Sequence, residues 1–369
     1  PFGSHGQPSF DDRATALSWG SRRIFESLGV WSSLETEAAP IRRVHVSERG
    51  RFGATRLDAA EAKVEALGYV VPNRLIGKAL SDALKDRSNV TFFAPAKLKS
   101  FRVAETEVDA EVEGETGHAL RARLLAAADG AKSEIREKLG IAGEVRDYGQ
   151  TAVICNIEVE HPESGTAYER FTPDGPFALL PQGGARYGLV WTVASGEAAA
   201  VLALDDVAFL EAAGERFGAR LGRFIRAGKR QSYPLAQVQA EVQSRERVVI
   251  IGNAAHSLHP IAGQGFNLSL RDVAVLAETI ATALREGRDI GATERLDAYV
   301  EARRRDQQVM ALFTDNLNRV FANPLASVAW ARNTGLLAME FLPSLRQVFL
   351  QRNLGVAGRL PRLARGLPL

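Results

Sequence analysis

The clearest hydrophobic pattern in the chain is a strand, a turn and a helix that follow one another between residues 248 and 285. Four branched apolar residues, Val248 to Ile251, predict a buried strand. A turn rich in glycine, proline and asparagine comes next, and apolar residues then recur at helical spacing at Val273, Leu276, Ala277, Ile280 and Leu284. Such a turn presents free backbone N–H groups at the N-terminus of the helix. The segment therefore predicts a site for a large polar cofactor.

The remaining pattern alternates between stretches with strand periodicity and stretches with helix periodicity. Strands are predicted over 41–70, 90–128 and 151–245, and helices over 13–31, 73–87, 206–220 and from about 292 onward. Strand-rich segments inserted between parallel-sheet units predict a cofactor-binding domain that a second, β-rich domain interrupts twice.

Composition narrows the class of protein without identifying it. The chain has 369 residues, a length that predicts two domains and a tail. Its hydrophobic content of 46% and charged content of 24% are ordinary for a soluble globular protein. A net charge of +2 gives no reason to expect a nucleic acid partner. Cys155, the single cysteine, is interpreted as a reduced core residue of a cytoplasmic protein, with a reactive thiol as the alternative. No apolar run is long enough to span a bilayer.

The glycine pattern of the turn differs from the two common phosphate-binding motifs. Gly265 is followed by Phe266 rather than by the lysine of a P-loop, and Leu268 stands where a dinucleotide fingerprint has its third glycine. Gly263 and Gly265 lack a Cβ, so the backbone can approach a ligand closely. From spacing alone, a tight connection that binds nothing remains an equal alternative.

Other kinds of active site find little support in the sequence. His256 and His259 lie three residues apart in a turn, but no third ligand has zinc-site spacing, so we expect no metal. No Gly-x-Ser-x-Gly elbow is present, which argues against a serine hydrolase. The pair Asp205-Asp206 is interpreted as a solvated helix start. The chemistry is therefore expected to come from a cofactor.

The longer string from 252 to 272 carries a family resemblance. Gly252-Asn253-Ala254-Ala255-His256, then Pro260, Gly263-Gln264-Gly265-Phe266-Asn267 and Asp272 closely resemble the second flavin motif of the group A FAD-dependent aromatic hydroxylases. That family usually has Asp where this chain has Asn253, whose amide oxygen can still accept a hydroxyl hydrogen bond.

Other segments support the resemblance in the order that the family has them. Asp129-Gly130, with Ser133 and Arg136 on the next helix, resembles the family's Asp-Gly motif. The segment from Asp11 to Leu17 resembles the one whose arginine, here Arg13, reaches the flavin. Further stretches resemble the ubiquinone-biosynthesis branch, most closely its 2-polyprenyl-6-methoxyphenol hydroxylases: 71–74, 175–181, 233–235, 259–267, 314–315 and 332–336.

The resemblance implies an α/β fold, namely a Rossmann-like FAD-binding domain of the p-hydroxybenzoate-hydroxylase type with an inserted β-rich substrate domain and a helical C-terminal segment. The implied FAD-binding domain comprises 1–40, 70–150 and 246–290, the substrate domain comprises 41–69 and 151–245, and the helical region comprises 291–369. Family members open with Gly-x-Gly-x-x-Gly, which carries the ADP half of FAD. No such string occurs here, so we expect the first strand of the sheet to be missing and FAD binding to be weakened.

The resemblance also implies a reaction. Reduced FAD reacts with dioxygen, and the resulting C4a-hydroperoxide hydroxylates a polyprenylated phenol in ubiquinone biosynthesis, with NAD(P)H or another reductase as the electron source. No side chain is identified as a general base. The implied cofactor-binding residues are Arg13, Asp129, Gly252, Asn253, Pro260, Gly263, Gly265 and Asn267, with Pro260 beside the flavin ring. Phe177, Tyr187 and Trp191 are candidates for the substrate pocket, with ordinary sheet core as the alternative.

Two alternative functions, and the role of the basic C-terminal segment, stay open at this point. The chain could instead be a sister hydroxylase with another ring position or a soluble phenol as its target, or a non-catalytic scaffold of a ubiquinone-biosynthesis assembly. After Glu340 no acidic residue occurs while five arginines remain, beside apolar positions on predicted helices. This basic amphipathic segment is typical of peripheral contact with the inner membrane face, or of a helix packed on its own protein.

Overall fold

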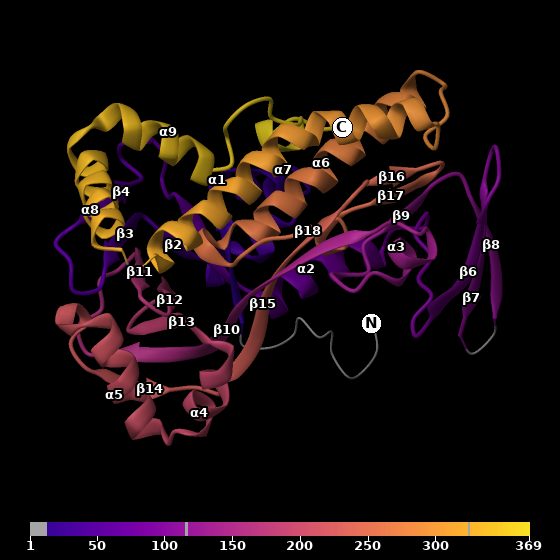
Figure 1. Cartoon of the computed structure of the whole chain (residues 1–369). Helices are drawn as coiled ribbons and strands as arrows, with labels where there is room; N and C mark the ends of the chain where they lie inside the picture. Colours follow the sequence, from indigo (N-terminus) through magenta and orange to yellow (C-terminus); the bar gives the residue numbers. More distant parts are fainter. Residues whose placement is uncertain (1–12, 115–116, 324) are drawn as a thin grey trace.

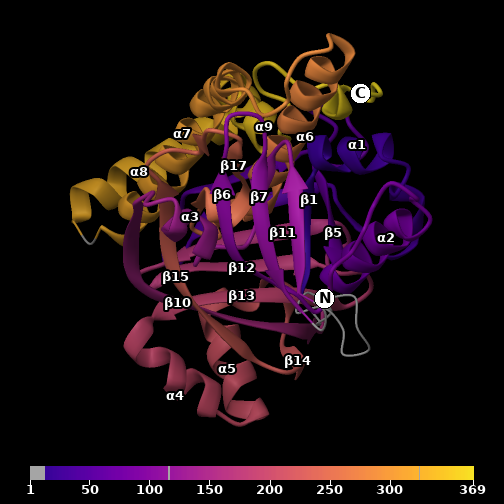
Figure 2. The ribbon, with the colours of Figure 1, turned by 90° about the vertical axis from the view of Figure 1, so that its right-hand side faces the viewer.

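A wide β-sheet separates two groups of helices in the computed structural model, which describes residues 13–114, 117–323 and 325–369 (Figures 1 and 2). Helices α4 (Ala198–Ala203) and α5 (Asp206–Phe217) cover one face of this sheet. The other face is turned toward the long C-terminal helices and the smaller sheets. The large sheet thus forms one wall of the space in which a ligand can be enclosed.

The remaining helices lie on the side opposite to α4 and α5. They are α1 (Trp19–Ser27), α2 (Asn73–Lys85), α3 (Glu134–Lys138), α6 (Gln264–Arg285), α7 (Thr293–Ala322), α8 (Ala326–Phe341) and α9 (Pro343–Asn353). The strands up to the Asp-Gly segment are β1 (Ala14–Ser18), β2 (Ala39–Ile41), β3 (Arg43–Glu48), β4 (Ala54–Asp58), β5 (Gly68–Pro72), β6 (Lys97–Val103), β7 (Val108–Glu113), β8 (His118–Ala122) and β9 (Leu125–Ala127). Those that follow are β10 (Gly143–Val159), β11 (Thr166–Thr172), β12 (Gly175–Pro181), β13 (Arg186–Ala194), β14 (Phe224–Ala227), β15 (Gln231–Ala240), β16 (Ser244–Arg245), β17 (Val248–Ile250) and β18 (His256–Ser257).

Strand pairing joins segments that are distant in sequence. The large sheet has nine strands in the order β18-β15-β10-β13-β12-β11-β3-β4, with β14 paired to β10. The early strands β3 and β4 enter it because β3 pairs in parallel with β11. In one of the three-stranded sheets, β17 of the glycine-rich segment pairs in parallel with β9, which precedes Asp129. This pairing brings the two presumed flavin motifs to the same edge.

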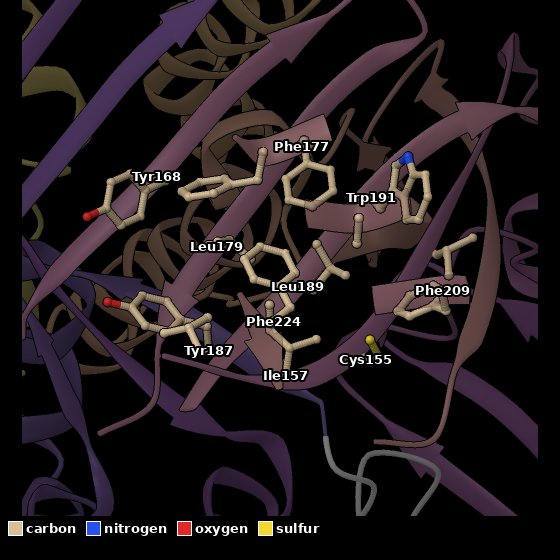
Figure 3. Close-up of a cluster of buried hydrophobic side chains, with 14 of the residues drawn as sticks. Cys155, Ile157, Tyr168, Phe177, Leu179, Tyr187, Leu189, Trp191, Phe209 and Phe224 are labelled. Atoms are coloured by element: carbon tan, nitrogen blue, oxygen red, sulfur yellow. The ribbon is translucent and has the colours of Figure 1, made fainter. Parts of the chain in front are cut away.

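Alternation along the strands divides the large sheet into a core face and an opposite face. On β12 and β13 the side chains of Phe177, Leu179, Leu189 and Trp191 point into the core beneath α4 and α5, where Figure 3 shows them packed together. Residues between them, such as Ala178 and Val190, point the other way, because successive side chains of a strand alternate between faces. The core face buries several aromatic rings and anchors the sheet.

Most predicted elements are confirmed, and one is wrong. Residues 13–31 do not form one helix: Ala14–Ser18 is strand β1, paired with β5, and the helix comprises only Trp19–Ser27. The Ser18 hydroxyl accepts a hydrogen bond from the backbone N–H of Ser21 and starts that helix as its N-cap. The implied domain division stays a prediction, and its boundary at residue 150 falls inside the continuous strand β10.

Candidate functional site

A cavity of about 750 Å³ lies between the second flavin motif and the large sheet. The glycine-rich turn contributes Gly252, Asn253, Pro260, Gly263 and Gly265 to its lining. The sheet contributes apolar side chains of β10 to β13, and α7, α8 and α9 add Leu317, Phe321, Leu336, Met339 and Phe349. The predicted turn residues therefore meet the apolar face of the inserted sheet in one cavity.

The N-terminus of α6 opens into this cavity without a capping side chain. Its N-cap residue is Gly263 in the left-handed conformation, and no side-chain hydrogen bond caps the helix in the part of the chain that is described. A Cβ added to Gly265 would meet no atom within 4 Å, so any side chain there would extend into free space. The first-turn N–H groups and the dipole of this 22-residue helix are available to an electronegative group.

Asn267 lines the cavity, and three hydrogen bonds within the protein hold its side chain. Its buried side chain donates hydrogen bonds to Ala16 O (2.9 Å) and Gly263 O (2.8 Å), and its Oδ1 accepts one from Ser18 N at 2.8 Å. These bonds tie strand β1 to the turn and hold the first turn of α6. Asn253, by contrast, is an exposed residue at the cavity, so its amide is accessible to a ligand.

Asp129 and Arg13 lie at the border of the cavity. The Asp129 carboxylate accepts a hydrogen bond from Ile135 N at 3.1 Å, and its neighbour Gly130 lines the cavity. The Arg13 guanidinium lies 5.0 Å from the ring centroid of Tyr233. Each residue thus has a structural contact of its own, and neither side chain belongs to the cavity wall.

Arg136 joins the Asp-Gly segment to the glycine-rich turn. Its buried guanidinium donates to Ala254 O at 2.8 Å and to Ala131 O at 3.1 Å. Ser133 caps the short helix α3 by accepting a hydrogen bond from Arg136 N at 3.0 Å. These contacts fix the two motifs relative to each other, which sequence spacing could not reveal.

A buried ionic network beneath the turn was missed at the sequence level. Asp272 on α6 is fully buried, and it accepts hydrogen bonds from His256, from Arg303 Nε at 2.5 Å and from Gln307 Nε2 at 3.1 Å. Burial alone would raise the pKa of Asp272, but the hydrogen bond from His256 and the charge of Arg303 outweigh it and hold that pKa below its usual value. The network locks the turn and α6 to α7.

A second cluster holds the turn at His259. Ile261 N donates to His259 Nδ1 at 3.3 Å, so Nε2 carries the proton and donates to Gln150 Oε1 at 3.2 Å. Asn318 of α7 donates to the same oxygen at 3.3 Å. Burial lowers the pKa of His259 to about 4 and keeps the imidazole neutral near pH 7. The turn beside Pro260 is thereby linked to strand β10 and to α7.

The three aromatic residues considered for the substrate pocket belong to the sheet core. Phe177, Tyr187 and Trp191 are almost completely buried in the cluster beneath α4 and α5, on the face opposite to the cavity (Figure 3). Cys155 lies in the same cluster, and burial raises the pKa of its thiol to about 12, so it is a core residue. Alternate residues of β12 and β13 point to opposite faces of the sheet, and this alternation, not the residue type, decides which side chains face the cavity.

The residues of the cavity fit the flavin end of FAD. An uncapped helix N-terminus suits the electronegative oxygens of the flavin ring, and Gly263 and Gly265 leave room for close approach. The apolar wall opposite can hold an aromatic ring and exclude water.

Comparison with known proteins agrees with this fit. A family model described as FAD binding domain matches residues 4–314. Ubiquinone hydroxylase UbiL of Rhodospirillum rubrum is 38% identical over 364 residues, which cover 98% of this chain and 84% of that protein. The 3-demethoxyubiquinol 3-hydroxylase of Escherichia coli is 30% identical and covers 96% of this chain and 90% of its own length. The p-nitrophenol 4-monooxygenase PnpA of Pseudomonas putida has the same fold, with a TM-score of 0.76 at 20% identity over 96% of this chain and 90% of that one.

Proposed function

The chain belongs to the FAD binding domain family of flavin-dependent monooxygenases, and on that premise we propose that it hydroxylates a polyprenylated phenol in ubiquinone biosynthesis. The observation that carries the proposal is the cavity in which the flavin motif faces an apolar sheet. Two relatives, a ubiquinone hydroxylase and a 3-demethoxyubiquinol 3-hydroxylase, support the substrate class by their names.

In this proposal the chain binds, orients and shields, while FAD supplies the activation of dioxygen when it is bound. Backbone N–H groups at Gly265 and its neighbours would bind the flavin, Gly252 and Asn253 would bind the ribitol, and Pro260 would shape the turn beside the ring. Arg13 and Asp129 would flank the cofactor. The apolar residues of β12 and β13 orient the phenol and exclude water. The electrons come from NAD(P)H or from a separate reductase.

We also propose that α8 and α9 contact a membrane surface, where a polyprenylated substrate is dissolved. Large apolar side chains on or beside these helices are exposed, among them Trp330 at 67% and Phe341 at 75%. The segment after Asn353 differs, because Leu363 and Ala364 are buried against α1 and α6. None of the described helices is both long and apolar enough to cross a bilayer. The contact is therefore proposed as peripheral, on the cytoplasmic face.

Two alternatives are separated from the proposal by specific outcomes. A sister hydroxylase would act on a soluble phenol or at another ring position. A scaffold protein in a ubiquinone-biosynthesis assembly would bind partners without FAD. The uncapped α6 N-terminus and the space above Gly265 favour a flavoprotein over a scaffold.

The proposal is tested with the full chain, added FAD and gel filtration. A retained flavin absorption spectrum is expected, followed by transfer of one oxygen atom to a prenylated methoxyphenol when a reductant and dioxygen are supplied. Mass spectrometry of the product measures that transfer. A colourless, folded protein would support the scaffold, and conversion of unprenylated phenols alone would support the sister hydroxylase.

A further inference from the structure

Two threonine hydroxyls are buried in the cavity wall without a hydrogen-bond partner. Thr55 on β4 and Thr192 on β13 are each 1% exposed, and both line the cavity. Neither Oγ1 has a partner among the described residues. A buried hydroxyl without a partner is costly, so such a group in a ligand cavity indicates a polar atom that the ligand supplies.

The two hydroxyls lie at opposite ends of the wall. The sheet order from β13 to β4 is β13-β12-β11-β3-β4, and four strand spacings correspond to about 19 Å. Thr55 lies toward α8, which packs on β4. Thr192 lies at the end where β10 and the turn beside Pro260 meet. The end at Thr192 is therefore the one next to His259 and Pro260 of the turn.

The position of Thr192 follows from its contacts. A Cβ built on Gly175 would be 2.6 Å from Thr192 Cγ2 and 3.0 Å from Gln150 Nε2, so the three residues are in close contact. Gln150 in turn accepts the hydrogen bond of His259, the neighbour of Pro260. The methyl group of Thr192 is held against Gly175. Around the hydroxyl the wall is apolar, with Ile154, Ala178 and Val190 on neighbouring positions.

We propose that Thr192 is a specificity-determining residue whose hydroxyl binds an oxygen substituent on the aromatic ring of the substrate. This inference rests on the proposed function and deepens it. A threonine hydroxyl can donate to a hydroxyl or methoxy oxygen and can accept from a phenol O–H. The polar atoms of a polyprenylated phenol are its ring oxygens, so the pairing orients the ring beside His259 and Pro260 and leaves the apolar chain toward α8.

The test measures binding of three probes to the FAD-supplemented full chain by titration calorimetry. The probes are a prenylated phenol, its methyl ether and prenylbenzene. The parent protein is expected to prefer the phenol to prenylbenzene by about 3- to 10-fold, the contribution of one hydrogen bond. Thr192→Val, which keeps the shape, should weaken phenol binding by that factor and remove the preference. Equal affinity of phenol and ether identifies Thr192 as the donor, and a loss for the ether identifies it as the acceptor.

Matched variants separate recognition from packing. Thr192→Ser keeps the hydroxyl and should restore the preference, whereas Thr55→Val removes the second of these two threonine hydroxyls and should leave the preference intact. FAD content should be the same in all three variants. A preference retained in Thr192→Val, or lost equally in Thr55→Val, would overturn the inference while leaving the proposed function in place. If the parent protein binds none of the probes, the proposed function itself fails and the inference fails with it.

Discussion

Removing Arg303 should destabilise the fold strongly, because Asp272 would keep a buried charge without its cationic partner. The side chains of Arg303 and Asp272 are 4% and 0% exposed, and the guanidinium also donates to Asp306 at 2.7 Å. Breaking a buried ion pair by removing one partner costs about 3–5 kcal/mol. At about 2 °C per kcal/mol for a chain of this size, Arg303→Met should lower the thermal midpoint by about 6–10 °C. Circular dichroism measures that midpoint.

The matched control is an exposed pair of the same chemistry. Arg102 contacts Asp109 at 3.1 Å, but its side chain is 80% exposed, so Arg102→Met should change stability by less than about 1 kcal/mol. The double variant Asp272→Asn with Arg303→Met removes both charges and should be more stable than the sum of the single effects predicts. A loss in Arg303→Met no larger than in Arg102→Met would refute the reasoning, as would strict additivity in the double variant.

The same network predicts an acid-side loss of stability. The pKa of Asp272 in the folded protein lies below its unfolded value, which is about 3.9. The contribution of Asp272 to the free energy of unfolding is therefore present above about pH 4 and is lost as the pH falls through the lower pKa of the folded protein. Asp272→Asn should show a smaller drop in midpoint over that acid range than the parent protein does.

Three further predictions concern the turn and the surface. Gly265→Val should lower the FAD content measured by absorbance, because the new side chain would enter the space proposed for the cofactor. Gly214→Val on α5 is the control, since a Cβ there also meets no atom within 4 Å, and it should not lower the FAD content. Equal FAD content in both variants would contradict the proposed site. Burial lowers the pKa of His259 to about 4, so the stability that its neutral imidazole contributes is complete above about pH 6.5 and is lost as the pH falls from there to about 4. His259→Gln should therefore flatten the plot of thermal midpoint against pH over that range. The same slope in the variant and the parent protein would contradict this prediction. Phe341→Ser should reduce co-sedimentation with anionic vesicles several-fold, whereas Val207→Ser, a change at a similarly exposed position on α5, should not. The same binding in both variants would indicate that α8 does not touch lipid.

Local sequence patterns were sufficient to predict an element wherever its conformation depends on residues that are close along the chain. The apolar run at 248–251 and the 3.6-residue periodicity after Gly263 predicted β17 and α6. Residues 14–18 misled, because a short strand and a helix start carry similar apolar content. Pairing of that segment with the distant strand β5, from Ala14 with Pro72 to Ser18 with Gly68, decided its conformation. The position of Asn267 was predicted, but the three hydrogen bonds that occupy its side chain were not.

By itself, the sequence determined the flavin motif, the strand-rich insert and the helical C-terminal region, because the pattern that predicts each of them consists of residues that are close along the chain. Only the tertiary structure decided which face of β13 lines the cavity, how Asp272 meets Arg303 across two helices, and that the hydroxyl of Thr192 has no partner among the described residues. Burial and hydrogen-bond satisfaction depend on groups brought together from distant segments. For that reason the motif indicated the cofactor, whereas the proposal of a substrate oxygen at Thr192 depended on the packed sheet.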